Sequence, residues 1–289
     1  MDKSMSRLFY EDSFKGMEYL ANTYCECIDA VITSPPYANQ RANQYGGIDE
    51  RDYPEWTVRW MELVKLILKP HGSVFINIRP HIRRGEISDY VLKTRLALRE
   101  AGWVECEELQ WLKPDSPPLG STRRPRRSWE HILWFSKSGN PFCDPKAGGD
   151  MSNRLGFENT KFEHGGKSHI HGGQNRPSSG IARVRDVIVA GTSKVEKGEY
   201  LTHPAMFPIE VPDYCIKLSC PKDGIVLDPF SGSGTTLRAA VKNDRGFIGF
   251  ENNKEYVKMA EKATISYILD NKKEDIYPDF IEVNGSEDE

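Results

Sequence analysis

The 289-residue sequence lacks the features of several other protein classes. It has no run of 18 or more apolar residues, the length at which a segment becomes a candidate membrane helix, and the N-terminus lacks the apolar core of a signal peptide. Hydrophobic residues make up 38% of the chain and charged residues 28%, enough apolar material for a sizeable core. We therefore expect a soluble, cytoplasmic globular protein with no membrane association.

Cysteine is scarce as well. Six cysteines are too few for a disulfide framework in a chain of this length, and no CxxC pair or HxxxH pattern supplies a zinc site. Three histidines, His164, His169 and His171, stand among glycines, and we interpret them as flexible contact residues in preference to metal ligands. We expect no bound metal.

Basic residues are missing from the C-terminal end. Seven acids and no Lys or Arg lie between Glu274 and Glu289, and without them 39 bases face 35 acids, so the net charge changes from −3 to +4. We interpret residues 271–289 as a solvated acidic tail. A basic cluster, Arg123, Arg124, Arg126 and Arg127, with Lys113 before it, lies in a Pro-, Ser- and Gly-rich stretch that predicts a loop. It either binds phosphates or is simply solvated.

The hydrophobic pattern alternates between short β-branched runs and helical spacing. Predicted strands cover residues 28–33, 73–78, 103–112, 129–136, 225–228 and 247–251, and predicted helices cover 54–68, 87–101, the segment after Thr236, and 254–269. This alternation predicts an α/β domain with a mostly parallel sheet. Between about 143 and 200 the periodicity fades and Gly, Ser, Asn and His accumulate, which indicates an insert.

Two glycines, Gly232 and Gly234, separate a predicted strand from a helix, which is the arrangement of a nucleotide-binding turn. Glu251 ends the next strand 23 residues after Asp228, close to the spacing at which a carboxylate meets a ribose hydroxyl in dinucleotide folds. No Lys follows the glycines, which argues against a P-loop. The turn predicts an adenosine-type ligand, although simple packing is an alternative.

A second motif, Thr33-Ser34-Pro35-Pro36-Tyr37, ends a predicted buried strand. Its prolines fix two φ angles and make the loop rigid. The Ser34 hydroxyl and the Pro35 carbonyl can accept hydrogen bonds from an exocyclic amino group, while the Tyr37 ring stacks on a flipped base. Alone, Ser-Pro-Pro-Tyr is also typical of proline-rich loops, but its place at a strand end favours a base pocket.

With both motifs present, the sequence resembles the amino-methylating DNA methyltransferases. Residues 34–37 look like their catalytic motif and residues 228–236 like their cofactor loop. The likeness covers roughly 7–142 and 201–268, and includes Phe9-Tyr10-Glu11-Asp12, Leu68-Lys69-Pro70-His71-Gly72-Ser73, Trp111-Leu112-Lys113-Pro114, Trp134-Phe135-Ser136-Lys137 and His203-Pro204-Ala205-Met206-Phe207-Pro208. The sequence departs from the family at Asp115, where Asn is expected, and at Trp129-Glu130-His131, where His-Glu is expected.

The motif order is similar to the circularly permuted β class of that family. The resemblance implies a Rossmann-like, doubly wound α/β fold with a mostly parallel sheet. Residues 1–142 form the first part of the catalytic domain, 143–200 a DNA-recognition insert, and 201–270 the second, cofactor-binding part.

The resemblance also implies residue roles and a cofactor, S-adenosyl-L-methionine. The catalytic loop is Ser34, Pro35, Pro36 and Tyr37. The residues expected to bind the methionine and adenosine parts of the cofactor are Asp228, Phe230, Gly232, Gly234, Thr235 and Thr236. Glu251 is expected to bind the ribose and Asp12 the adenine edge, with His203 and Pro204 nearby. His203 is equally well explained as a helix-start histidine.

We therefore predict a site-specific DNA methyltransferase acting on an exocyclic amino group in duplex DNA. In the family, Ser at the first motif position is associated with cytosine N4 and Asp with adenine N6, so Ser34 favours cytosine N4. The alternatives are an adenine N6 enzyme, an RNA methyltransferase and a catalytically silent DNA-binding protein. The sequence leaves open the recognition site, the oligomeric state (monomer or homodimer) and whether a companion restriction endonuclease exists.

Overall fold

The computed structural model describes residues 6–39, 47–116, 122–149, 181–192, 207–273, 276 and 278–282. The strands of its main sheet are β1 (Ser6–Tyr10), β2 (Ile28–Thr33), β3 (Leu68–Ile78), β6 (Val104–Leu112), β7 (Trp129–Ser136), β8 (Val187–Val189), β9 (Ile225–Asp228), β10 (Gly246–Glu251) and β11 (Asp279–Glu282). A separate hairpin contains β4 (Ile82–Arg83) and β5 (Glu86–Ile87). The helices are α1 (Ser13–Thr23), α3 (Tyr53–Ile67), α4 (Tyr90–Glu100), α5 (Glu210–Ser219), α6 (Thr235–Lys242) and α7 (Lys254–Asp270).

The nine strands form one sheet in the order β11-β1-β10-β9-β2-β3-β7-β6-β8. All neighbours are parallel except that β7 runs antiparallel to both β3 and β6. The predicted mostly parallel sheet is confirmed. From the central pair β2 and β9, the chain builds the sheet outward in opposite directions, which is the arrangement that opens a crevice at the carboxyl ends of the strands.

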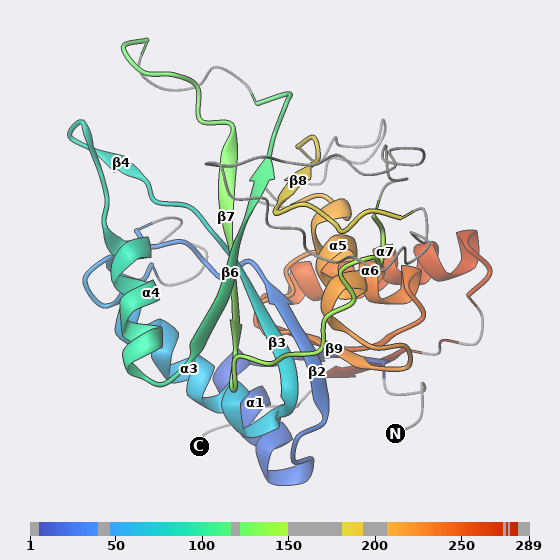
Figure 1. Ribbon diagram of the computed structural model, residues 1–289. Coiled ribbons are helices and arrows are strands. Elements are labelled where there is room, and N and C mark those ends of the chain that lie inside the picture. Colours follow the sequence, from blue (N-terminus) through green and yellow to red (C-terminus); the bar gives the residue numbers. More distant parts are fainter. Residues whose placement is uncertain are drawn as a thin grey trace, which may run out of the picture.

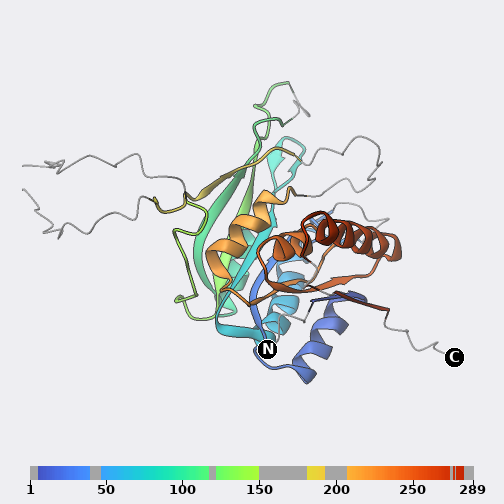
Figure 2. The ribbon, with the colours of Figure 1, turned by 90° about the vertical axis from the view of Figure 1, so that its right-hand side faces the viewer.

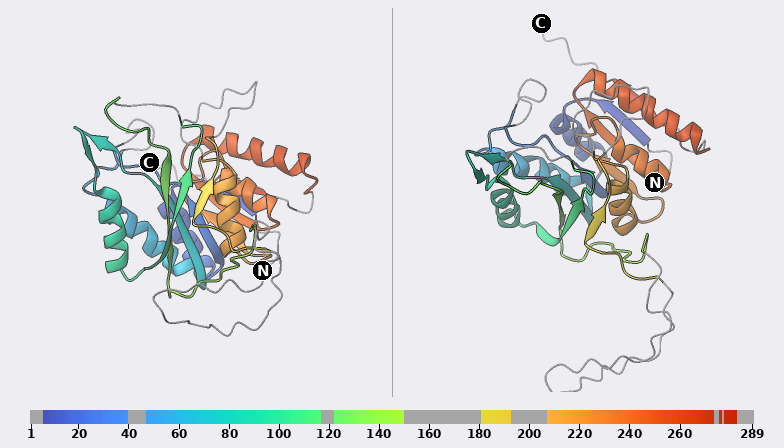
Figure 3. Two further views of the ribbon diagram at one scale, coloured as in Figure 1. Left: turned by 45° about the horizontal axis from the view of Figure 1, so that its top comes forward. Right: turned by 90° about the horizontal axis from the view of Figure 1, so that it is seen from above.

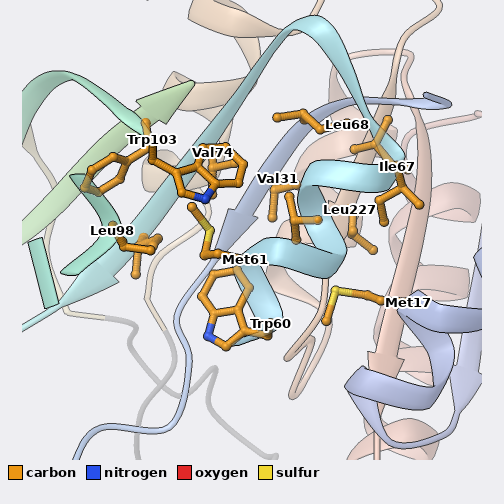
Figure 4. Close-up of a cluster of buried hydrophobic side chains, with 14 of the residues drawn as sticks. Met17, Val31, Trp60, Met61, Ile67, Leu68, Val74, Leu98, Trp103 and Leu227 are labelled. Atoms are coloured by element: carbon orange, nitrogen blue, oxygen red, sulfur yellow. The ribbon is translucent and has the colours of Figure 1, made fainter. Parts of the chain in front are cut away.

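Helices cover both faces of the sheet, as a parallel sheet requires (Figure 1). Helices α1, α3 and α4 pack together on one face, and α5, α6 and α7 on the other. The view from above in Figure 3 shows the strands passing between these two groups. On the first face, Trp60 and Met61 of α3 are fully buried against Val31 and Leu227 (Figure 4). Apolar side chains along α3 thus tie the two central strands to one layer.

Local signals explain several of the element ends. Asp12 caps α1 by accepting hydrogen bonds from the Phe14 and Lys15 amides, and Asn253 caps α7 in the same way. The helix predicted to end before Pro70 stops at Ile67, and β3 starts at once, so the strand predicted for 73–78 is longer than expected. The Pro-His-Gly segment therefore lies within a strand.

The two ends of the chain meet in the sheet. Strand β1 lies between β10 and β11, so the cofactor-type half of the fold combines N-terminal and C-terminal residues, as a permuted order requires. Strand β11, within the expected acidic tail, pairs in parallel with β1 (Figure 2). Strand β8, within the expected insert, pairs with β6. Parts of both segments therefore belong to the sheet and not to appendages.

The helices were compared with the length and apolar character of membrane-spanning segments. Within the described ranges, no helix has both the length and the apolar character needed to cross a bilayer.

Candidate active site

A cavity of about 830 Å³ opens where the strands end. Strands β1, β2, β3, β6, β9 and β10 all point their carboxyl ends to this edge, and the antiparallel β7 begins there. The residues that line it are Glu11, Asp12, Ser13, Phe14, Ser34, Pro35, Pro36, Tyr37, Ile48, Trp56, Asn77, Arg79, Pro80, His81, Ile82, Trp111, Lys113, Arg127, Glu130, Thr192, Phe207, Asp228, Pro229, Phe230, Ser231, Gly232, Ser233, Thr235, Thr236, Phe250, Glu251 and Asn252. The volume accommodates a nucleoside-sized ligand together with a base.

The loop at the end of β2 forms one wall of the cavity, and Ser34, Pro35, Pro36 and Tyr37 all line it. The Tyr37 hydroxyl donates to Oε2 of Glu130 at 2.7 Å and lies 3.1 Å from Oδ1 of Asn77. Burial, and then the neighbouring Glu130 carboxylate, raise the pKa of Tyr37 well above its usual range. The tyrosine therefore stays a neutral hydrogen-bond donor.

The turn between β9 and α6 lies next to this loop, because β9 and β2 are neighbours in the sheet. Asp228 ends β9 and accepts a hydrogen bond from the Phe230 amide at 3.1 Å, while the Gly232 amide donates to Oε2 of Glu251 at 2.9 Å. Gly232 has φ of 50° and Gly234 φ of 78°, the left-handed region that favours glycine. The glycines let the backbone turn sharply from strand to helix next to the two carboxylates.

Asp228 and Glu251 are 2% and 5% exposed, and neither forms an ion pair within the described part of the chain. Burial raises the pKa of Asp228 to about 6 and that of Glu251 to about 7. In Glu251 the two oxygens each accept a backbone amide, from Gly232 and from Asn253. These buried acceptors without a cation suit a ligand that carries hydroxyl groups and positive charge.

Aromatic side chains cover the floor between α1, α3 and this turn. Trp56 lies with its ring centroid 5.4 Å from Phe230 and 6.4 Å from Phe14, and all three line the cavity. Asp12 lies on the same side, at the start of α1. A planar ring such as adenine fits between apolar faces of this kind.

The opposite end of the cavity holds a charged cluster built from β3, β6 and β7. Glu130, at the start of β7, is 7% exposed and forms an ion pair with Lys113, while Nη1 of Arg79 lies 3.7 Å from the same oxygen, Oε1. The Lys113 ammonium also lies 3.9 Å from the centre of the Trp111 ring. Burial lowers the pKa of Lys113, and Glu130 opposes that shift.

The structure separates some residues that the sequence had grouped. Gly234 does not line the cavity; a side chain there would meet Ala260 of α7 at 2.9 Å, so this glycine permits helix packing. Lys113, which the sequence grouped with the basic cluster, is buried, pairs with Glu130 and lines the cavity. His203 and Pro204 lie outside the described residues.

The basic loop is divided as well. Arg127 lines the cavity, whereas Arg123, Arg124 and Arg126 are exposed outside it. Arg124 donates to the Gly85 carbonyl at the tip of the β4–β5 hairpin. Figure 1 shows this hairpin and the loop before β7 projecting beyond the end of the sheet. The loop and the hairpin thus form one rim of the cavity.

Sequence reasoning missed several cavity residues that follow or begin strands. Arg79 comes directly after β3, Asn252 directly after β10, and Glu130 is the second residue of β7. The rule that parallel strands end at one edge would have selected the first two, because the C-terminal ends of their strands were predicted correctly. It would not have selected Glu130, since the rule concerns residues that follow a parallel strand, whereas Glu130 lies at the start of the antiparallel β7.

The departures from the family pattern have local explanations. Asp115 accepts hydrogen bonds from the Thr192 amide at 2.9 Å and the Thr192 hydroxyl at 3.2 Å, and Thr192 lines the cavity. His131 lies with Nδ1 2.5 Å from Glu108 on the sheet, outside the cavity lining. No group of three His, Cys, Asp or Glu residues arranged for a metal ion occurs in the ranges that the structure describes.

Comparisons with known proteins agree with this geometry. The profile of a DNA methylase family matches residues 28–262. The type II methyltransferase M.PvuII of Proteus hauseri is 28% identical over 91% of this chain and 85% of its own length. M2.DpnII of Streptococcus pneumoniae is also 28% identical, over 90% of both chains.

Solved structures show the same fold. The cytosine-N4-specific PvuII DNA methyltransferase superposes with a TM-score of 0.67 at 24% identity and covers 94% of both chains. The complex of M1.HpyAVI with S-adenosylmethionine gives a TM-score of 0.58 at 24% identity, over 90% of this chain and all of the other, 100%. This chain belongs to the DNA methylase family of N6- and N4-methylating enzymes, which act on DNA and use S-adenosylmethionine.

Proposed function

We propose that this enzyme methylates N4 of a cytosine flipped out of duplex DNA, with residues 34–37 as its catalytic loop. The observation that carries the proposal is the position of Ser34. It follows β2, the strand that pairs with β9, and Asp228 ends β9, so the base loop and the cofactor turn lie side by side in the lining of one cavity. A cofactor and a base bound to these two segments would lie next to each other inside the cavity, so the methyl group could be transferred directly.

The cofactor fits the wall formed by β9, β10 and α1. The ionised Asp228 and Glu251 offer buried acceptors for its ammonium group and ribose hydroxyls, and Phe14, Trp56 and Phe230 offer faces for its adenine. Asp12 lies at the same end. When bound, S-adenosylmethionine supplies an electrophilic methyl group on a sulfonium centre. The roles predicted for Thr235, Thr236, His203 and Pro204 remain proposals.

In our proposal the catalytic loop activates the exocyclic amino nitrogen of the base, which is a weak nucleophile. An aromatic amino nitrogen reacts poorly because its lone pair is delocalised into the ring. In our proposal the Ser34 hydroxyl and the Pro35 carbonyl accept hydrogen bonds from the amino group, which favours a pyramidal nitrogen and directs its lone pair away from the ring. The ring of Tyr37 supports the face of the base. The proton leaves after transfer, so a strong general base is not required.

Cytosine is favoured over adenine on two grounds. The first residue of the catalytic loop is Ser and not Asp. The relative with a solved structure that shares 94% coverage is described as cytosine-N4-specific. Both grounds concern the base that is modified, and both leave the surrounding recognition sequence open.

DNA is the macromolecular substrate, and its contacts extend beyond the cavity. We propose that Arg123, Arg124 and Arg126 hold phosphates at the rim and that Arg127 acts closer to the target base. Residues 143–200 remain our proposed recognition segment, apart from β8. A companion restriction endonuclease is proposed from the type II relatives.

The deciding experiment measures the product. Purified enzyme with labelled S-adenosylmethionine and unmethylated plasmid DNA should yield N4-methylcytosine on nucleoside digestion. N6-methyladenine would correct the base, while 5-methylcytosine or no transfer would sink the proposal. S34A should slow single-turnover transfer by about 100-fold and change cofactor affinity less than about threefold, since Ser34 acts on the amino group. S138A, a serine that donates to Pro70 at the far edge of the sheet, serves as the matched control.

A further inference from the structure

Tyr37 depends on groups outside its own loop for its orientation. Its hydroxyl donates to Glu130 Oε2 at 2.7 Å, and Asn77 Oδ1 lies 3.1 Å away. Glu130 belongs to β7 and Asn77 to β3, so two strands of the sheet hold the end of the tyrosine whose ring lines the cavity. A ring fixed at both its Cβ and its hydroxyl cannot tilt freely.

Asn77 cannot turn its amide away from this contact without losing another one. Its Nδ2 donates to the His131 carbonyl at 3.1 Å, on the neighbouring strand. The antiparallel register of β3 and β7 pairs Asn77 with Ile132 and Ile78 with His131, which brings that carbonyl within reach. The amide is therefore fixed with its oxygen toward the tyrosine.

Glu130 is fixed from its other side. Its Oε1 bonds to Lys113, and Arg79 lies 3.7 Å from the same atom, so Oε2 is left for the tyrosine. Lys113 is held in turn over the Trp111 ring, and the Trp111 indole donates to the Ala190 carbonyl at 3.0 Å. Pairing on one oxygen therefore fixes the direction in which the Glu130 carboxylate presents the other.

We propose that Glu130 is a positioning residue for methyl transfer, which acts by holding the Tyr37 ring at the angle where the target base stacks. This inference rests on the proposed base pocket at residues 34–37. Glu130 needs no contact with the substrate in this role. Its effect on the rate passes through one hydrogen bond, so it disappears when Tyr37 has no hydroxyl.

A double-mutant cycle tests this dependence. Y37F keeps the ring and removes the hydroxyl, whereas E130Q keeps the shape and replaces the charged acceptor of that hydroxyl with a neutral, weaker one. Each single variant should lower the single-turnover rate about 10-fold, with cofactor affinity unchanged within about twofold. The double variant Y37F/E130Q should be no slower than the slower single variant. Additive losses, or an equal loss of cofactor affinity, would overturn the proposal.

Glu108 gives a matched control. It is also paired with charged neighbours on the sheet, Arg95 at 2.8 Å and His131 at 2.5 Å, but it neither touches Tyr37 nor lines the cavity. E108Q should leave the rate near wild type, and its effect should add to that of Y37F. A melting temperature measured for every variant separates unfolding from misplacement. If the product proves to be N6-methyladenine, the assigned base fails while the same cycle still tests the link between Tyr37 and Glu130.

Discussion

The two ends of the cavity treat buried carboxylates in opposite ways. At the cofactor end, Asp228 and Glu251 accept backbone amides and have no cationic partner among the described residues, and their pKa values rise to about 6 and about 7. At the base end, Glu130 is paired with Lys113 and faces Arg79. The negative charge is therefore uncompensated at the cofactor end and is balanced by neighbouring cations at the base end.

Unpaired and paired carboxylates suit different tasks: the first can bind a ligand, and the second can orient a neighbouring side chain. A buried carboxylate without a partner costs the folded protein free energy, about 1.4 kcal/mol for each unit by which its pKa is raised. That cost is recovered when a ligand brings hydroxyl groups or positive charge. A carboxylate already paired with lysine gains little binding free energy from a ligand, so its contribution is to orient neighbouring groups. In our proposal the cofactor therefore binds at one end and the base-orienting network lies at the other.

The largest effect is expected from D228N. Losing one hydrogen bond to a charged acceptor should weaken S-adenosylmethionine binding by about 10- to 100-fold in calorimetry. In the absence of cofactor, the same variant should be more stable than wild type at pH 8, by an amount on the order of 2 kcal/mol, because the uncompensated charge is gone. Unchanged affinity would break the comparison at its cofactor end.

The sign of that stability gain depends on pH. The pKa of Asp228 is about 6 in the folded protein against a usual 3.8, so burial favours the protonated form. Its destabilising effect is absent below about pH 4, grows as the pH rises to about 6, and is complete above that. Thermal melts of D228N and wild type should therefore converge as the pH falls from 8 to 4.

A smaller effect is expected from pH on cofactor binding by the wild-type enzyme. Because the pKa of Glu251 is about 7, its carboxylate is mostly protonated at pH 6 and loses its capacity to accept both ribose hydroxyls. Affinity for S-adenosylmethionine should fall about 10-fold between pH 8 and pH 6. An affinity that is flat over this range would show that Glu251 does not bind the ligand in its ionised form.

The smallest effect on cofactor binding is expected from changes at the rim, which belongs to neither end. The double variant R123A/R124A should weaken DNA binding about 10-fold at low salt and reduce the salt dependence by about two phosphate contacts, with cofactor affinity unchanged. A control, K222A/K258A, removes two exposed charges that lie away from the cavity lining. Equal losses in both variants would indicate a general charge effect, without a specific role for the rim.

The sequence by itself determined the α/β alternation, the two motifs and their order. These are local properties: β-branched runs, helical spacing, the rigid prolines at 35 and 36, and glycines at 232 and 234 that tolerate left-handed backbone. A parallel sheet then places the residues at the ends of its strands on one edge, so the proximity of Ser34, Asp228 and Glu251 could be predicted from the sequence.

Only the tertiary structure decided the rest. The direction of β7 follows from its pairing with β3 and β6, which no local pattern reports, and that direction carries Glu130 to the active edge. Trp56 has the spacing of a core residue, and only helix packing turns it toward the cavity. Whether Lys113 meets a phosphate or a buried carboxylate depends on a neighbour 17 residues away in the chain, because burial and charge pairing are properties of the assembled fold.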